Sequence, residues 1–152
     1  SWARSSETLG RSGTVKLFVD ANILISGLLF EGNERLLLEL GRYGTCELVT
    51  IEYVRGEVAD FLGRPAVRLS EEEQRKLLAV LDRSVVARRD PPIADVRAAL
   101  GRLRDEDDIP VLVGFEGSEA DYLVTGDREL RGSTPKAVSA RHALELLLGQ
   151  FD

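Results

Sequence analysis

Apolar residues along this chain form short runs that alternate with segments of helical periodicity. The run Val-Lys-Leu-Phe-Val at 15–19 is rich in β-branched and aromatic residues, which is typical of a strand buried on both faces. Further strands are expected at residues 47–50, 84–88, 120–125 and 136–139. The chain therefore contains enough strand segments for a sheet of four or five strands.

Between these runs, apolar residues recur at helical spacing. Helices are expected at residues 23–29, 34–40, 51–62, 74–81, 93–103, 109–115 and 141–148. Thr50 is placed to cap the helix at 51–62, Ser70 and Glu73 form a capping box, and Pro110 falls in a first turn where proline is tolerated. Strands that alternate with helices predict a three-layer α/β/α sandwich around a mainly parallel sheet.

A length of 152 residues fits one domain with a sizeable core, here expected at residues 14–150. Residues 1–13 are polar and rich in Ser and Gly, which predicts a disordered leader or a remnant of expression. No apolar run approaches the roughly 20 residues of a membrane-spanning helix. Cys46 is the only cysteine, which excludes an intrachain disulfide and a cysteine-based metal site, and we expect it in the core of a cytoplasmic protein.

Acidic residues follow the ends of two expected strands. Asp20 directly ends the first apolar run, and Asp127 comes two residues after Thr125. Because parallel strands of one handedness end at the same edge of a sheet, these carboxylates are expected to lie close together. Glu57, in the helix at 51–62, and Asp108, before the helix at 109–115, can reach the same edge.

Carboxylates that meet at one edge repel one another unless a pKa rises or a counter-charge binds. A divalent cation is the simpler solution, and the net charge of −6 agrees with a site that must itself be acidic. That net charge also argues against attraction to nucleic acid through overall charge. Because only oxygen ligands are available near these positions, the pattern favours Mg²⁺ or Mn²⁺ over Zn²⁺.

Each acid also has an ordinary structural explanation. Asp20 and Asp127 fit turn or helix-cap positions, Glu57 fits a solvated helix face, and residues 105–107 fit the first turn of a helix. It is their joint order and spacing that favours a shared site. Among other residues of catalytic type, His142 lies far in sequence from every acid, and we expect Tyr53 and Tyr122 in the core rather than as base-stacking platforms.

The strings around these acids resemble the motifs of PIN-domain nucleases. Val-Asp20-Ala-Asn22 resembles the first motif, Val-Arg-Gly-Glu57-Val the second, and Arg-Asp105-Glu-Asp-Asp108-Ile-Pro the third. Ala-Asp-Tyr-Leu-Val-Thr-Gly-Asp127 resembles the fourth and is the most specific string of the chain. The resemblance covers about residues 15–148, and it is nearest to the branch of toxin components in toxin–antitoxin pairs.

This resemblance implies a Mg²⁺- or Mn²⁺-dependent endoribonuclease whose catalytic and metal-binding residues are Asp20, Glu57, Asp108 and Asp127. It implies that Asn22, Ser26, Thr125 and Asp105 hydrogen-bond and orient these carboxylates, and that Arg55, Arg64 and Arg68 contact the RNA backbone. Its implied partners are an RNA substrate, an antitoxin protein and a second copy of the chain, without a membrane.

The sequence departs from the family pattern at a few positions. Ala21 replaces a frequent Thr, Gly114-Phe115-Glu116 replaces small residues of the central helix, and Val138-Ser139-Ala140 replaces a more usual Thr-Pro. None of these changes removes an expected ligand, but the change at 114–116 bears on local packing.

Two other interpretations remain open. One is a PIN-like scaffold that binds RNA or a protein partner without catalysis. The other is a phosphoacceptor receiver domain, which also places Asp residues at strand ends around Mg²⁺. That chemistry needs a Lys after a late strand, whereas Lys136 begins one, so the receiver interpretation is disfavoured.

Overall fold

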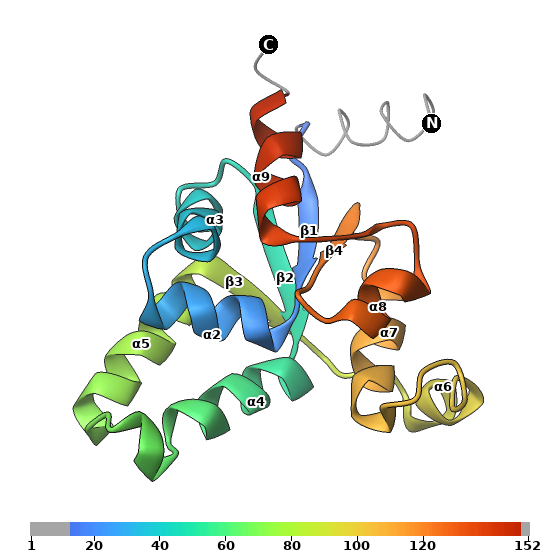
Figure 1. Ribbon diagram of the computed structural model, residues 1–152, viewed down its shortest axis with the longest axis horizontal. Helices are drawn as coiled ribbons and strands as arrows, with labels where there is room; N and C mark the ends of the chain where they lie inside the picture. Colours follow the sequence, from blue (N-terminus) through green and yellow to red (C-terminus); the bar gives the residue numbers. More distant parts are fainter. Residues whose placement is uncertain (1–12, 150–152) are drawn as a thin grey trace.

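The strand β1 (Lys16–Val19) lies at the centre of the sheet in the computed structural model, which describes residues 13–149 (Figure 1). The other strands are β2 (Glu47–Ile51), β3 (Val85–Arg88), β4 (Tyr122–Val124) and β5 (Ala137–Val138). They form one sheet of order β3-β2-β1-β4-β5, and every pairing between neighbours is parallel. The expected three-layer α/β/α architecture with a parallel sheet is confirmed.

Helices connect the strands and cover both faces of the sheet (Figure 1). They are α2 (Ala21–Leu29), α3 (Asn33–Arg42), α4 (Glu52–Leu62), α5 (Glu71–Ser84), α6 (Ile93–Ala98), α7 (Ile109–Glu116), α8 (Arg128–Ser133) and α9 (Ala140–Leu148). Two short 3₁₀ turns, η1 (Pro65–Val67) and η2 (Glu106–Asp108), precede α5 and α7. Within residues 13–149, no helix combines the length and apolarity needed to cross a membrane.

The two helical layers differ in how they meet the sheet. Helices α2, α3, α5 and α9 pack against one another on one face, whereas α6 and α7 lie on the other. Helix α4 follows the carboxyl end of β2 and contacts both α2 and α7. This position makes α4 a bridge between the layers at the edge where the strands end.

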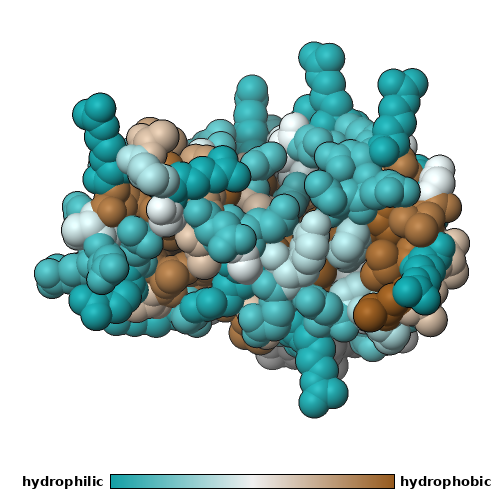
Figure 2. All heavy atoms as spheres, turned by 90° about the horizontal axis from the view of Figure 1, so that it is seen from below, coloured by the Kyte–Doolittle hydropathy of each residue, from teal (hydrophilic) through white to brown (hydrophobic). Residues whose placement is uncertain are grey.

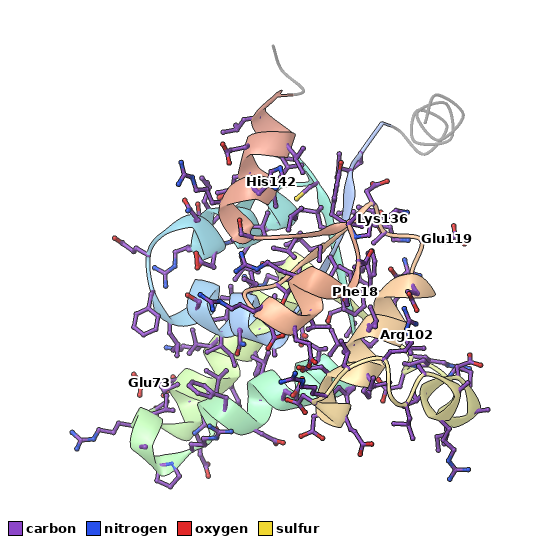
Figure 3. All side chains as sticks on the ribbon, turned by 45° about the vertical axis from the view of Figure 1, so that its right-hand side comes forward. Phe18, Glu73, Arg102, Glu119, Lys136 and His142 are labelled. Carbon is purple, nitrogen blue, oxygen red and sulfur yellow. The ribbon has the colours of Figure 1, made fainter. Side chains whose placement is uncertain are left out.

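The unusual sequence at 114–116 is accommodated by close packing of α7 on the sheet. A Cβ atom at Gly114 would lie 3.1 Å from two side-chain carbons of Ile51, so the missing side chain lets α7 approach β2. Phe115 packs edge-on against Phe18, with ring centroids 6.2 Å apart, and Figure 3 shows Phe18 in the interior between the layers. Glu116 lies at the surface and forms an ion pair with Arg102 at 2.6 Å.

Several local expectations are confirmed. Ser70 and Glu73 form a reciprocal capping box at the start of α5, and Pro110 occupies the first turn of α7. Cys46 is buried, as expected. Of the expected leader at 1–13, all residues but Gly13 lie outside the described part of the chain.

Other local expectations are wrong. Thr50 does not cap α4, because its buried hydroxyl donates a hydrogen bond of 2.9 Å to the carbonyl of Val19 and so links β2 to β1. The expected helix at 93–103 ends at Ala98, and Gly101, with a positive φ of 98°, prevents the helix from extending to residue 103. The expected strand at 120–125 shortens to the three residues of β4.

Close approach of α2 and α3 generates a prediction about stability. A Cβ atom at Gly27 would lie 2.6 Å from Leu38 Cδ1 and 2.8 Å from the carbonyl oxygen of Glu34. The Gly27→Ala variant is therefore expected to lower the free energy of unfolding by about 1–3 kcal/mol, measured by urea denaturation.

Gly56→Ala is the matched control, because Gly56 also lies within a helix but a Cβ atom added there would meet no atom within 4 Å. That variant is expected to be unchanged or more stable by up to about 1 kcal/mol, since Ala favours helix. Equal stability of the two variants would contradict the tight α2–α3 contact.

Candidate active site

Asp20 lies at the centre of the carboxyl edge of the sheet, where β1 gives way to α2. Its side chain is only 5% exposed and caps the helix, because Oδ1 accepts a hydrogen bond of 2.8 Å from the backbone N–H of Ala21. Its second oxygen, Oδ2, accepts a hydrogen bond of 2.8 Å from the hydroxyl of Thr125. The pKa of Asp20 is raised overall. Burial is the main cause and the charge of Asp127 adds to it, whereas the two hydrogen bonds lower the pKa.

Thr125 joins the ends of two neighbouring strands. Val19 and Val124 are register partners, so Asp20 and Thr125 follow β1 and β4 at the same level. The fully buried Thr125 hydroxyl donates to Asp20 and accepts a hydrogen bond of 3.1 Å from the backbone N–H of Asp127. One hydroxyl group therefore holds two of the expected acids in a fixed relation.

Asp127 begins α8 as its N-cap. Its Oδ1 accepts a hydrogen bond of 2.9 Å from the backbone N–H of Leu130. Asp20 and Asp127 therefore both cap helices, as the sequence indicated. They also lie near each other at the edge of the sheet. A capping role and a ligand role are compatible because each carboxylate oxygen has more than one lone pair.

Glu57 lies on α4 and remains accessible at the rim of the acidic edge. Partial burial raises the pKa of Glu57 to about 7, and nearby negative charge adds to the effect. The contributing carboxylates, in decreasing order, are those of Asp20, Asp107, Asp105 and Asp60. Helix α4 has thus carried Glu57 to the same side of the molecule as Asp20.

Asp108 ends η2 and is half-buried where α7 begins. Burial raises the pKa of Asp108 to about 7, again with a contribution from negative charge. The contributing carboxylates, in decreasing order, are those of Asp127, Asp105, Asp20 and Glu57. Because such effects weaken with distance, Asp20, Glu57, Asp108 and Asp127 form one cluster, which we call the acidic cluster.

Glu129, which the sequence did not single out, fastens η2 to α8. Its carboxylate accepts hydrogen bonds from the backbone N–H groups of Arg104, at 2.7 Å, and Asp105, at 3.3 Å. Asp105 in turn caps its own turn, since Oδ1 accepts from the N–H of Asp107 at 3.0 Å. The only sequence feature that marks Glu129 is a second acid two residues after Asp127.

The remaining expected site residues stand apart from these contacts. Asn22 is exposed and Ser26 half-buried on α2, and no hydrogen bond within residues 13–149 joins either side chain to the acidic cluster. Arg55 forms a two-pronged ion pair with Asp82, at 2.8 and 2.9 Å, and Arg64 lies over the ring of Phe61. The expected roles of Asn22 and Ser26, and of the arginines in RNA contact, remain predictions.

Arg68 also remains a predicted RNA contact. It is exposed after η1 and adopts a left-handed backbone with φ of 61°.

The acidic cluster suits a hard divalent cation by its chemistry. Its donors are all carboxylate oxygens, which Mg²⁺ and Mn²⁺ prefer, and the pKa values of Glu57 and Asp108 are near 7, raised first by burial and then by the neighbouring carboxylates. Within residues 13–149, no three His, Cys, Asp or Glu side chains stand close enough to share one ion as they are placed. Side-chain rotation of the accessible acids toward Asp20 would be needed to close a coordination shell.

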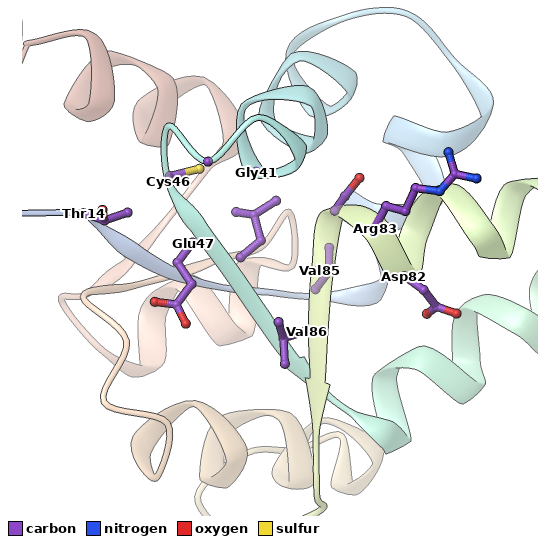
Figure 4. Close-up of a pocket in the computed structure, with 11 residues that line it drawn as sticks. Thr14, Gly41, Cys46, Glu47, Asp82, Arg83, Val85 and Val86 are labelled. Carbon is purple, nitrogen blue, oxygen red and sulfur yellow. The ribbon is translucent and has the colours of Figure 1, made fainter. Parts of the chain in front are cut away.

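A cavity of about 340 Å³ lies at the opposite edge, where β2 and β3 begin (Figure 4). Cys46, Glu47 and Val85 contribute to its wall, and none of its lining residues belongs to the acidic cluster. His142 lies on α9 (Figure 3), is exposed to solvent and takes no part in the cluster. The candidate site is therefore confined to the carboxyl edge.

A parallel sheet of order β3-β2-β1-β4-β5 with carboxylates gathered at its carboxyl edge defines an α/β protein with an acidic site at the ends of its strands. The model of the PIN domain family matches residues 16–129, and the chain belongs to this family. PIN domains are generally nucleases, so the fold is of nuclease type.

A solved structure agrees with this assignment. The crystal structure of PAE2754 from Pyrobaculum aerophilum is similar with a TM-score of 0.66 and 25% sequence identity, over 89% of this chain and 96% of that one. No curated protein matched the chain.

The raised pKa values of the cluster predict a dependence of stability on pH. Glu57 and Asp108 bind protons more tightly in the folded state, so their contribution to stability is complete below their ordinary pKa of about 4 and is lost as pH rises through about 7. Without metal, the melting temperature is therefore expected to fall between pH 5 and pH 8.

Asp108→Asn should reduce this fall, because an amide cannot titrate. Carboxyls with a lowered pKa, such as those of Asp82 and Glu116, lose their contribution only at lower pH and do not disturb this range. A melting temperature that rises toward pH 8, or an unaltered slope in Asp108→Asn, would contradict the electrostatic account.

Thr125→Val tests the link between Asp20 and Asp127. The valine leaves a buried carboxylate with one hydrogen bond fewer, so the free energy of unfolding is expected to fall by about 1–3 kcal/mol in urea denaturation. Thr50→Val is the matched control, because the buried hydroxyl of Thr50 bonds a neutral carbonyl instead, and its loss should cost about 1 kcal/mol or less. A larger loss in Thr50→Val would contradict the central role of Thr125.

Proposed function

We propose that the protein is an endoribonuclease that hydrolyses RNA phosphodiesters with Mg²⁺ or Mn²⁺ at the acidic cluster. One observation carries the proposal. Four acids from separate parts of the chain, at the ends of β1 and β4, on α4 and in η2, interact electrostatically at one edge of a PIN-type sheet. Carboxylates that gather without a basic partner are a feature of functional sites, and a site for divalent cations requires such a set of oxygen ligands.

In this proposal, Asp20, Asp108 and Asp127 hold the ion. When bound, a divalent cation lowers the pKa of water and neutralises charge on the phosphorane-like transition state. Asp20 is fixed by two hydrogen bonds, so it forms the rigid floor of the site. Asp127 is fixed through its bond to Leu130 N–H.

Glu57 orients the attacking water in this proposal. Its accessible carboxylate lies at the rim, where it can accept a hydrogen bond and a proton from a water molecule. Glu129 maintains the position of η2, and hence of Asp108, relative to the helix that Asp127 begins.

The resemblance to toxin components supports a narrower biological role. In that role the protein is the toxin of a toxin–antitoxin pair in the cytoplasm, forms a homodimer and is neutralised by an antitoxin protein. A neighbouring reading frame for a small DNA-binding protein would support this role, and its absence would count against it without affecting the nuclease proposal.

Cleavage of RNA by the purified protein tests the enzymatic proposal. With Mn²⁺, the wild-type chain should cleave RNA, and EDTA should abolish cleavage. Asp20→Asn should lower the cleavage rate by more than about 100-fold, because loss of a metal ligand costs more than loss of a residue that only supports one. Glu57→Gln should also lower the rate. Glu145→Gln, which changes an exposed acid on α9 remote from the cluster, is the matched control and should retain full activity.

Two results would contradict this function. If the folded protein cleaves no RNA tested and neither Mg²⁺ nor Mn²⁺ shifts its melting temperature, the chain is a scaffold that binds RNA or a protein without catalysis. Equal loss of activity in Glu145→Gln would show that the variants act through folding rather than through the cluster.

A further inference from the structure

A small apolar pocket lies directly beside the acidic cluster. It has a volume of about 210 Å³ and lies between the start of α4, the loop after β3, helix α6 and the start of α7. Its lining residues are Tyr53, Asp90, Pro91, Ile93, Val96 and Pro110. None of the roles assigned to the cluster uses this pocket.

The pocket is joined to the cluster through the chain itself. Tyr53 stands one helical turn before Glu57 on α4, and Pro110 stands two residues after Asp108. The hydroxyl of Tyr53 donates a hydrogen bond of 2.9 Å to the backbone carbonyl of Asp107. When a phosphate of a ligand lies at the acidic cluster, the group of the ligand next to that phosphate is therefore within reach of the pocket.

Tyr53 forms a wall that is fixed at both ends. Its backbone N–H donates a hydrogen bond of 2.7 Å to Oδ1 of Asp90, and its hydroxyl is held by Asp107. Tyr53 packs against the core, as expected, but it is only partly buried and also lines the pocket. A rigid aromatic ring together with proline side chains offers flat apolar surfaces on which a planar ring can stack.

The outer side of the pocket is an exposed apolar surface. Ile93 is 69% exposed, and Figure 2, which views the molecule from the side of the strand ends, shows brown apolar surface gathered at its right-hand end, where α6 lies. This apolar surface adjoins the pocket and extends it outward.

Charge selects among possible ligands. Asp90 in the wall and the nearby acids disfavour an anion inside the pocket, so a phosphate group is excluded there. A carboxylate instead accepts hydrogen bonds from an exocyclic amino group, as found on adenine, cytosine and guanine. The exposed side chain of Arg89, next in sequence to Asp90, can meet a backbone phosphate outside the pocket.

We propose that the pocket formed by Tyr53, Asp90, Pro91, Ile93, Val96 and Pro110 binds the nucleobase adjacent to the scissile phosphate and favours a base with an exocyclic amino group. This proposal rests on the proposed nuclease function. It assigns Tyr53 and Ile93 to base stacking and Asp90 to recognition of the edge of the base.

Short RNAs with one abasic position test the proposal. Each nucleotide flanking the mapped cleavage site is replaced in turn, and kcat/KM is measured for wild type, Ile93→Glu and the control Leu100→Glu. Leu100 follows α6, is 48% exposed and does not line the pocket, so it matches Ile93 in chemistry and exposure. Ile93 and Leu100 are both largely exposed, so neither substitution is expected to unfold the chain.

In wild type, one abasic position should lower kcat/KM by about tenfold, the typical effect of one stacked base. Ile93→Glu should lower kcat/KM on intact RNA to a similar degree and should no longer respond to that abasic position. Leu100→Glu should behave as wild type. Wild-type cleavage that is indifferent to every abasic position, or equal effects of the two variants, would overturn the proposal while leaving the nuclease function standing.

Base identity tests the role of Asp90. With uracil at the sensitive position, wild type should cleave more slowly than with adenine, cytosine or guanine. Asp90→Asn can still accept from the N–H of Tyr53 through its own Oδ1 and should reduce this difference. An unchanged preference in Asp90→Asn would overturn the recognition role.

The same RNAs can test base binding even if the protein has no nuclease activity. If wild type cleaves no RNA, fluorescence anisotropy of labelled RNAs in Mg²⁺ measures binding alone. Weaker binding of the abasic RNA, abolished by Ile93→Glu, would support the base pocket in a non-catalytic protein. A dimer that dissociates in Ile93→Glu without any change in abasic sensitivity would show that a second copy covers the pocket, and would overturn the proposal.

Discussion

Repulsion between carboxylates at the carboxyl edge of the sheet is the constraint around which this molecule is built. Parallel strands bring their ends together, so Asp20 and Asp127 meet without any special loop. The fold offsets part of the repulsion because both acids cap helices, whose N-termini carry partial positive charge. The hydroxyl of Thr125 donates a hydrogen bond to the carboxylate of Asp20 and accepts one from the backbone N–H of Asp127.

Burial and the remaining repulsion act together on the other two acids of the cluster. Glu57 and Asp108 both have a pKa near 7, which means that the folded protein holds them partly protonated at neutral pH in the absence of a cation. Because these acids bind protons more tightly in the folded state, they lower the stability of the folded protein at neutral pH relative to lower pH. The apolar residues directly beneath, including Phe18, Val19, Leu123 and Val124, are completely buried and support the strained edge from below.

The position of α4 explains how distant parts of the chain serve one site. This helix contacts both helical layers, so it presents Glu57 to the acidic cluster and Tyr53 to the neighbouring pocket. The hydrogen bond from Tyr53 to Asp107 ties α4 to η2, and Glu129 ties η2 to α8. The backbone around the cluster is therefore held by a chain of contacts between elements.

Much of this organisation follows from the sequence alone. The buried strand at 15–19 and the capping box at Ser70 are local properties of the chain, set by side-chain period and by hydrogen bonds within a few residues, and both appear as expected. The order of the four acids relative to strand ends also indicated that they would meet, since parallel connections leave few alternatives.

Only the tertiary structure decided what depends on contacts between elements. Thr50, a plausible cap by sequence, bonds to Val19 because β1 lies beside it, and Glu129 gains its role only because α8 lies against the loop before η2. The depth at which Glu57 and Asp108 lie, and hence their raised pKa, depends on how α4 and α7 cross the edge of the sheet. These features escape sequence analysis because burial and long-range hydrogen bonds are properties of neighbours far apart in the chain, whereas periodicity and capping are properties of neighbours close along it.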